Sequence, residues 1–519
     1  MVEDSRPRGG GGLAWPVAAA LAVLAAGAAV GLAVEFHYLG WTSFPGNGCG
    51  GRYAPCPDGT TPTLLLAFLL TFTGFPAATA AVAALTKARP GKVLPAALLT
   101  AGVLLALWPG RQAYLWMRGP VLDVVWKAGP DRPPTARGLG VWTVGPGSAT
   151  VVRVRTDALV AYDARDGDRA WTLRVPVRES VCGMSESVTD GIGLVAFGRF
   201  AKPCDTVWGV DVRTGRKVWE RGIDGVTDSS EARDSLLTAD AGVAVALADG
   251  SVRGFGLADG APRWTAKVTD ARARKDDVEC TPLVASAARG TTRVVVTCSS
   301  LSGVLRTARL LTLDTATGRE TGRRPLPVES AVRTAVVVSA EPFTLLLQEE
   351  DKRGLAAVLS WSGTGGEPVD IPLTTDDEDL AVLPDDGSFA ARPALSAVVE
   401  GRSLIVAAAV PGKDDPERIS AYSLADGRPL WHTDLGAPIA ALAPADRGEL
   451  AVLGSDARLY TLDERDGDRR GEADGTTVRG ADGDYGELAG GSQLLRAGGT
   501  WIVVNSTGSS SPPVLGLRP

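Results

Sequence analysis

Asparagine and histidine are the scarcest chemistry-bearing residues in this sequence. Its 519 residues include only Asn47 and Asn505, and only His37 and His432. Zinc sites and histidine-dependent catalytic triads rely on imidazole groups, so the scarcity of histidine disfavours both. The sequence also lacks a Gly-x-x-x-x-Gly-Lys loop, which argues against a P-loop nucleotide site.

An excess of positive charge is also missing. The chain carries 53 Lys and Arg against 60 Asp and Glu, for a net charge of −7, and the charges are dispersed. A phosphate backbone is bound by clustered basic residues. We therefore expect no nucleic acid partner.

Long apolar stretches are present, and all lie near the N-terminus. Leu13–Val34 and Pro62–Leu85 contain no charged residue and are long enough to cross a bilayer. Val93–Trp108 is shorter and needs either the residues Gln112–Met117 beyond Arg111 or a thinned bilayer to span. The sequence predicts a three-helix membrane anchor over residues 13–117. The alternative for the first stretch is a cleaved signal peptide, which would leave the following chain on the same side.

Positive charge sets the orientation of this anchor. Arg6 and Arg8 precede the first helix, and Lys87, Arg89 and Lys92 fill the loop after the second helix without any acidic residue. Such clusters mark the cytoplasmic side of a membrane. We expect a cytoplasmic tail over 1–12, an external loop over 36–61 and an extracytoplasmic domain after residue 117, in a multi-pass protein of the cell membrane.

The six cysteines all fall on the side predicted to be external, where disulfides persist. They form three near pairs along the sequence, which favours local bridges Cys49–Cys56, Cys182–Cys204 and Cys280–Cys298. Six cysteines allow about fifteen connectivities, and free buried thiols are the other alternative. A zinc site is disfavoured because no Cys-x-x-Cys occurs.

One motif recurs seven times after residue 138: an apolar strand, then Asp or Thr, then Gly, then a second strand. Glycine adopts positive φ easily, so each copy predicts a hairpin turn. In four copies a Trp follows shortly after the glycine, at a position suited to packing between sheets. The glycines are Gly167, Gly215, Gly260, Gly318, Gly365, Gly427 and Gly467, and the tryptophans are Trp171, Trp219, Trp264 and Trp431.

The spacing of the copies indicates the size of the repeating unit. Successive glycines are roughly 40–60 residues apart, which is about the length of one four-stranded propeller blade. The longer intervals contain the polar inserts Lys267–Glu279 and Thr374–Asp386, which we expect to be surface loops.

These copies resemble the pyrroloquinoline-quinone (PQQ) type β-propeller repeats, whose blades read Tyr-x-Leu-Asp-x-x-Thr-Gly-x-x-x-Trp. The resemblance covers Leu139–Pro519 and implies an all-β propeller of seven or eight blades after a linker over 118–138. Eight blades are favoured, because this length divides into eight units of about 48 residues. Short strands around Leu494, Ile502 and Leu515 would then complete the eighth blade with Gly140–Val144.

The resemblance also raises the possibility of a quinone dehydrogenase. Such enzymes hold the quinone on the propeller axis with a calcium ion bound by Glu, Asn and Asp, often below a disulfide between adjacent cysteines. This sequence has no adjacent cysteines, its repeat region has only Asn505 at its far end, and Asp376–Asp379 has the pattern of a solvated charge run. His432 directly follows Trp431, which indicates an ordinary strand residue. We therefore assign no catalytic, cofactor-binding or metal residue and expect no cofactor.

The remaining function is binding. The sequence favours a non-enzymatic extracytoplasmic scaffold or binding propeller, with a protein or peptide ligand on the propeller face and the lipid bilayer as its anchor. The resemblance extends to the blades of the lipoprotein propeller that assists outer-membrane protein assembly. Two alternatives stay open: a PQQ-dependent membrane dehydrogenase, and a ligand-sensing domain that signals through a separate partner.

Overall fold

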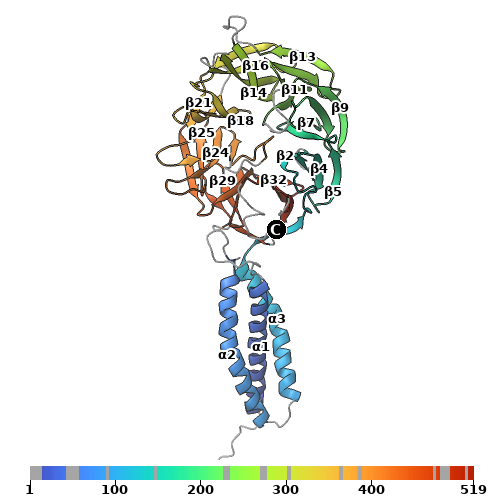
Figure 1. Cartoon of the computed structure of the whole chain (residues 1–519). Coiled ribbons are helices and arrows are strands. Elements are labelled where there is room, and N and C mark those ends of the chain that lie inside the picture. The colour runs from blue at the N-terminus through green and yellow to red at the C-terminus, as the bar shows by residue number, and fades with distance from the viewer. Residues whose placement is uncertain are drawn as a thin grey trace, which may run out of the picture. The chain divides into compact units, whose positions relative to one another are not determined.

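The computed structural model divides the chain into two compact units, Met1–Val121 and Leu122–Pro519. It describes residues 14–42, 56, 58–88, 93–144, 149–225, 234–268, 278–300, 306–361, 366–383, 389–471, 475–479, 491–508 and 512–519. Figure 1 shows the helices of the first unit and the ring of β-sheets of the second. The predicted tail 1–12, Cys49, Gly365 and most of the predicted loop 267–279 lie outside the described residues.

The first unit consists of α1 (Ala14–Thr42), α2 (Thr60–Ala88) and α3 (Val93–Arg118). All three are long and apolar enough to cross a membrane. The third helix is longer than its uncharged stretch, because it continues through Pro109 and Arg111. The predicted external loop 36–61 is too wide, since α1 continues to Thr42 and α2 begins at Thr60.

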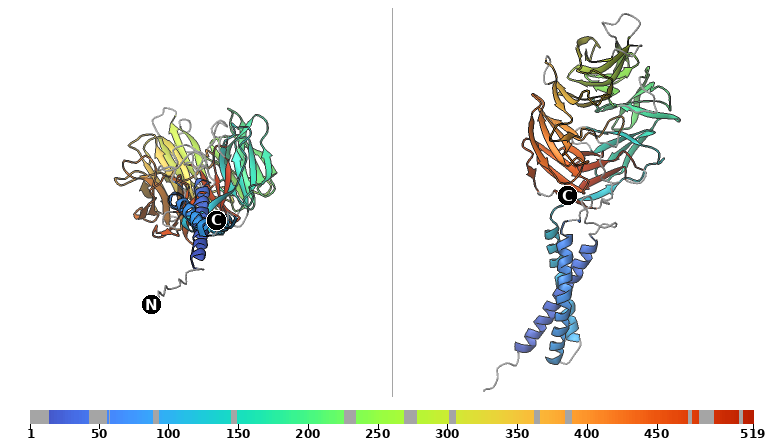
Figure 2. Two further views of the ribbon diagram at one scale, coloured as in Figure 1. Left: turned by 90° about the horizontal axis from the view of Figure 1, so that it is seen from below. Right: turned by 60° about the vertical axis from the view of Figure 1, so that its left-hand side comes forward.

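Small residues bring α1 and α3 together, and Figure 2 shows the blue helices running side by side. A Cβ added to Gly102 would lie 2.2 Å from the carbonyl oxygen of Leu24, and one added to Gly27 would lie 2.4 Å from that of Leu99. Membrane helices associate without a hydrophobic driving force between them, so close backbone packing takes its place. On the other side of α1, His37 Nε2 lies 3.1 Å from Thr71 Oγ1 of α2.

The second unit is a β-propeller whose described residues form eight blades, and the strands of each blade run from the central channel outward. Blades one to four are β2 (Gly138–Thr143), β3 (Thr150–Arg155), β4 (Ala158–Asp163) and β5 (Arg169–Arg174); β6 (Glu179–Met184), β7 (Ile192–Arg199), β8 (Thr206–Asp211) and β9 (Arg216–Gly222); β10 (Leu237–Asp240), β11 (Val243–Ala248), β12 (Ser251–Gly256) and β13 (Pro262–Lys267); and β14 (Val278–Ala288), β15 (Thr291–Ser300), β16 (Arg306–Asp314) and β17 (Glu320–Pro325).

The later blades depart from this pattern at three places: the inner strand of blade six is split, blade seven carries an extra outer strand, and blade eight borrows a strand from the start of the unit. Their strands are β18 (Val332–Ala340), β19 (Phe343–Glu349), β20 (Ala356–Trp361) and β21 (Val369–Pro372); β22 (Asp379–Leu380), β23 (Ala397–Glu400), β24 (Ser403–Ala409), β25 (Arg418–Ser423) and β26 (Pro429–Asp434); β27 (Ile439–Pro444), β28 (Glu449–Gly454), β29 (Arg458–Asp463), β30 (Arg469–Arg470) and β31 (Thr476–Arg479); and β32 (Gln493–Ala497), β33 (Thr500–Val504), β34 (Val514–Arg518) and β1 (Val121–Lys127).

Burial follows the position of each strand in its blade. The second strand of blade three, β11, is buried throughout, whereas the outermost strand, β13, has only exposed and half-buried residues. The middle strands have a neighbouring sheet on both faces, so they are continuously apolar rather than alternating. The apolar cores therefore lie between blades, and each blade depends on its neighbours.

The eighth blade corrects two sequence predictions. β1 pairs with β34, with Asp123 opposite Arg518 and Trp126 opposite Gly516. Residues 121–127 are therefore a propeller strand and not linker. The predicted placement of Gly140–Val144 in blade eight is also wrong, because this strand is β2, the inner strand of blade one. The ring thus closes by pairing the first strand of the unit with the last, and β1 also neighbours β31 of blade seven.

A buried ion pair sits beside this closure. Arg153 of β3 donates through Nη1 to Asp131 Oδ2 at 2.7 Å, and Arg155 Nη1 lies 2.9 Å from Asp131 Oδ1. Arg153 also donates to the carbonyl oxygens of Asn505 and Ser506, at 3.0 and 2.9 Å. The pair therefore joins the segment after β1, blade one and the loop before β34. Removing one partner of such a pair leaves a buried charge uncompensated, which costs about 3–5 kcal/mol.

Candidate functional site

The predicted turn glycines lie where the motif placed them. The six described ones, Gly167, Gly215, Gly260, Gly318, Gly427 and Gly467, all have positive φ, between 64° and 76°. Each sits in the turn between the third and fourth strands of its blade. Their conformation and the close packing described next explain why glycine recurs there.

The four predicted tryptophans pack against the next blade. A Cβ at the turn glycine of the following blade would lie 2.3–2.7 Å from the indole, in the pairs Trp171–Gly215, Trp219–Gly260, Trp264–Gly318 and Trp431–Gly467. The indole nitrogens of Trp219, Trp264 and Trp431 donate to carbonyl oxygens of the next blade at 2.6–3.1 Å. The indole nitrogen of Trp171 is buried and has no hydrogen-bond partner among the described residues.

The sequence reasoning missed a fifth tryptophan of this kind. Trp126 on β1 packs on Gly167 of blade one, where an added Cβ would lie 2.3 Å from its ring. Its indole nitrogen donates to the carbonyl oxygen of Ala164 at 3.1 Å. Gly516, opposite Trp126 in the register, matches Gly209 and Gly254, which face Trp219 and Trp264. That glycine near the C-terminus was the sequence signal for a missing outer strand.

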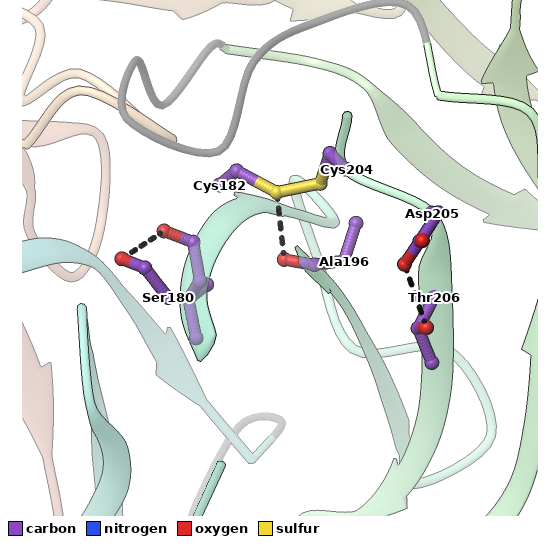
Figure 3. Close-up of a disulfide and its surroundings, with 7 residues drawn as sticks. Ser180, Cys182, Ala196, Cys204, Asp205 and Thr206 are labelled. Carbon is purple, nitrogen blue, oxygen red and sulfur yellow. Dashed lines mark hydrogen bonds between the residues drawn. A yellow bond between two sulfur atoms is a disulfide. The ribbon is translucent and has the colours of Figure 1, made fainter. Parts of the chain in front are cut away.

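Two of the three predicted disulfides are present, Cys182–Cys204 and Cys280–Cys298. Cys280 and Cys298 are directly opposite on β14 and β15. Cys182 of β6 reaches Cys204 in the connection between β7 and β8, beside the carbonyl of Ala196 (Figure 3). The predicted bridge Cys49–Cys56 includes a residue outside the described part.

The inner edge of blade six contains an insertion. β22 and β23 both pair with β24, with Leu380 opposite Ala408 and Ala397 opposite Val406, so they are successive pieces of one inner strand. The Ser396 amide donates to the Val382 carbonyl oxygen at 3.0 Å and closes the base of the chain between them. We call its described residues, 389–395, the blade-six insert.

The blade-six insert reaches blade one. The amides of Ala391 and Arg392 donate to the Leu139 carbonyl oxygen at 3.1 and 2.9 Å, and Arg392 Nη1 donates to that of Val141 at 2.9 Å. Phe389 is buried in the core between blades eight and one. Blades seven and eight separate blade six from blade one along the ring. The insert therefore crosses the interior of the propeller.

Arg392 brings a positive charge to two acids from other blades. Glu186 follows β6 of blade two, and Asp234 precedes β10 of blade three; both interact electrostatically with Arg392. Ser286 of blade four places its Oγ 3.4 Å from Glu186 Oε2. We call Glu186, Asp234, Ser286 and Arg392 the channel cluster. Four blades contribute to it, so it belongs to the channel rather than to any blade.

Enclosure by the protein dominates the electrostatics of this cluster. Burial raises the pKa of Asp234 to about 7; the charge of Glu186 adds to the rise, while Ser235 and Arg392 oppose it. Burial also raises the pKa of Glu186, against Arg392 and Ser286, and lowers the pKa of Arg392. Asp234 can thus exchange a proton near neutral pH, a property of catalytic acids and of structural ion-pair networks alike.

The channel cluster does not fit a quinone with its calcium ion. Calcium takes about six to eight oxygen ligands, whereas Arg392 places a cation beside the two carboxylates. Among the described residues, no three His, Cys, Asp or Glu side chains gather as a metal site. The repeated tryptophans lie on outermost strands, so they do not form a cofactor floor on the axis. His432 is an exposed residue of the outer strand β26.

The acidic run Asp376–Asp379 is only partly solvated, which corrects the interpretation of it as a charge run in water. Asp376, Asp377 and Asp379 are exposed, but Glu378 is buried and accepts hydrogen bonds from Ser420 and Tyr422 at 2.7 and 2.6 Å. These hydrogen bonds hold the Glu378 carboxylate within blade six.

No repeat signal marked the channel cluster. Its residues stand outside the recurring motif and come from different blades. The one indirect signal was the interval between Gly365 and Gly427, which is the longest between successive turn glycines. The polar residues 374–386 within it predict a surface loop, whereas the residues that follow them form the blade-six insert.

The pKa of Asp234 predicts how stability depends on pH. An acid whose pKa is raised on folding holds its proton more tightly in the folded state, so stability falls as the pH rises from the unfolded pKa to the folded one, here about 7. Above the folded pKa, the stability that comes from the protonated Asp234 is fully lost. We expect Asp234 to lower the free energy of unfolding of the full chain in nanodiscs by roughly 2–3 kcal/mol between about pH 5 and about pH 8. Urea titrations followed by tryptophan fluorescence measure it.

Asp234→Asn should remove the part of this fall that Asp234 carries, because the amide does not ionise, and leave only the part carried by Glu186, whose pKa is also raised. Asp249→Asn, in an exposed turn of blade three, is the matched control and should keep it. An unchanged pH dependence in Asp234→Asn would show that other groups carry it.

Comparison with known proteins identifies the repeats. A family model described as outer membrane protein assembly factor BamB, of the PQQ type, matches residues 123–366 and 385–508. No curated protein matches the sequence.

Similar solved structures share little sequence with the chain. BamB from Moraxella catarrhalis is 13% identical, with a TM-score of 0.42, over 76% of this chain and 97% of that one. The quinohemoprotein alcohol dehydrogenase from Comamonas testosteroni is 13% identical, with a TM-score of 0.43, over 77% and 76%. The computationally designed protein Ika8 is 12% identical, with a TM-score of 0.43, over 77% and 100%.

The assignment rests on the family model, which spans more than half of the chain and begins inside β1, the strand that closes the ring. The chain belongs to the BamB-like family of PQQ-type β-propeller repeat proteins.

Proposed function

We propose that this protein is a non-enzymatic, extracytoplasmic binding or scaffold propeller held in the cell membrane by its three helices. The observation that carries the proposal is that the protein's own chain enters the central channel. The blade-six insert crosses it, and Arg392 faces the two channel acids there. The tryptophans, the other candidate cofactor contacts, pack between blades. The recognition surface that remains is the outside of the ring and its loops.

The positive-inside rule supports the orientation. Lys87 lies in the last turn of the second helix, and Arg89 and Lys92 follow it before the third, without an acidic residue among them. With that loop inside, the chain after α3 is outside. An extracytoplasmic location also agrees with the two disulfides of the propeller, which persist in oxidising compartments.

Titration with PQQ and calcium separates a scaffold from a quinoprotein. We expect no micromolar binding by calorimetry and no dye-linked oxidation of alcohols or sugars, because the channel cluster offers a cation where calcium would need oxygen ligands. The full chain in nanodiscs is the sample, and a PQQ dehydrogenase is the positive control.

Trp219→Ala tests the packing role in the same experiment. Trp219 is 6% exposed, so its removal should lower the free energy of unfolding by about 3–5 kcal/mol. Micromolar quinone binding by the parent that is lost in a folded Trp219→Ala variant would replace the scaffold with a quinoprotein.

Topology has its own test. A reporter active only outside the cytoplasm should work when fused after Pro519 and fail when fused between Lys87 and Lys92, because the basic loop stays inside. A reporter active only in the cytoplasm should give the reverse pattern. Extracytoplasmic activity at the loop fusion would contradict the three-helix orientation.

A further inference from the structure

We propose that residues 176–178, which connect β5 of blade one to β6 of blade two, and residues 199–203, at the end of β7 and in the turn after it, form a docking surface for an acidic peptide segment that carries apolar side chains. We call these residues the blade-two patch. The inference rests on the proposed binding function and specifies where that binding takes place.

The patch contains the most exposed apolar side chains in the described part of the propeller. Val177 is 92% exposed and Phe200 is 70% exposed. The described part of the propeller has three other exposed large apolar side chains. They lie on the outermost strands of three different blades: Val125, Val218 and Leu430. Only Val177 and Phe200 come from loops, and the Phe200 amide donates to the Arg178 carbonyl oxygen next to Val177 at 3.2 Å.

The two loops are held in fixed conformations. Glu179 donates its amide to the Pro176 carbonyl oxygen at 3.1 Å, and Lys202 does the same to that of Arg199 at 2.9 Å, so each loop is a tight turn. Arg178 and Ala201 have φ values of 71° and 56°, a region that non-glycine residues rarely adopt. Such backbone persists only where the surroundings enforce it, and it is common at binding sites.

The Cys182–Cys204 disulfide joins the ends of these loops. Cys182 lies on β6, which begins directly after the first loop, and Cys204 directly follows the second (Figure 3). The exposed Val177 and Phe200 are therefore presented on a covalently joined base. A preorganised surface loses less conformational freedom when a partner binds, which favours binding.

The charges of the patch determine its partner. Arg178, Arg199 and Lys202 flank the two apolar side chains, and all three are exposed. Arg178 and Lys202 have no ion-pair partner among the described residues. An aromatic side chain among arginines is a frequent composition of binding hot spots, and the positive charge selects acidic ligands.

Acidic groups at the edge favour a peptide over a lipid surface. Glu179 and Asp205 border the patch and would repel a continuous negative surface such as an anionic membrane. A peptide can place its acidic side chains on Arg178 and Lys202 and keep them away from these two acids.

The test uses the full chain in nanodiscs of zwitterionic lipid and a fluorescein-labelled decapeptide in which Asp or Glu alternates with Phe or Leu. Fluorescence anisotropy should show saturable binding that weakens as salt is added. Two control peptides, one with Lys for the acids and one with Ser for the apolar residues, should bind at least ten-fold more weakly.

Phe200→Ser and Arg178→Glu should each raise the Kd at least ten-fold. Both side chains are exposed, so the variants should fold, which circular dichroism checks. Leu430→Ser, an equivalent change at a side chain 51% exposed on another blade, should leave the Kd unchanged.

Three results would overturn the proposal: no preference for the acidic apolar peptide, an unchanged Kd in Phe200→Ser, or Phe200-dependent binding to vesicles of anionic phospholipid in place of the peptide. If the peptides fail while the quinone titration shows no binding, this surface is wrong and the scaffold function stands. Quinone binding would contradict the scaffold function whatever the peptides do.

Discussion

The pairing of β1 with β34 is the constraint on which the propeller depends. Each core lies between two blades, so a blade at an open end would expose one apolar face. The outermost strand of blade eight comes from the start of the unit, and Trp126 on that strand packs on Gly167 of blade one. One strand therefore completes the eighth sheet and the interface between the last blade and the first.

The ion pair of Arg153 with Asp131 gives this closure its specificity. A buried pair adds little net stability compared with apolar packing, but breaking it is costly, and its hydrogen bonds reach the loop of Asn505 and Ser506 as well as blade one. Alternative pairings of β1 would leave these groups unsatisfied, so we infer that the pair selects the closed register.

The closed ring also defines what the channel can do. Glu186, Asp234 and Arg392 are far apart in sequence, and only the ring and the blade-six insert bring them near one another. Arg392 interacts electrostatically with both acids, and Asp234 is poised to exchange a proton. A propeller whose channel holds its own side chains is well suited to present a rigid outer surface, which is how we interpret the blade-two patch.

The repeated parts of this architecture were predictable from sequence, and the unique parts were not. The turn glycines and the four tryptophans follow one local rule, since each indole needs a turn without a side chain in the next blade. Trp126 obeys the same rule but stands at the other end of the chain from its sheet, so the motif search did not find it.

The channel cluster was unpredictable because its members come from four blades and follow no common spacing. The burial of Glu378 was also unpredictable, because it depends on hydrogen bonds to β25 that no local pattern encodes. The three apolar helices were predictable because a long apolar stretch suffices to identify them, whereas their contacts through Gly27 and Gly102 depend on which faces meet.

Removal of β1 tests the closure most directly. Urea unfolding would compare a propeller beginning at Pro120 with one beginning at Gly129, with hydrogen exchange read out blade by blade. The account predicts one cooperative transition for the first protein, and loss of that transition in the second, with protection lost first in blades eight and one. Equal midpoints and equal protection in the two proteins would contradict it.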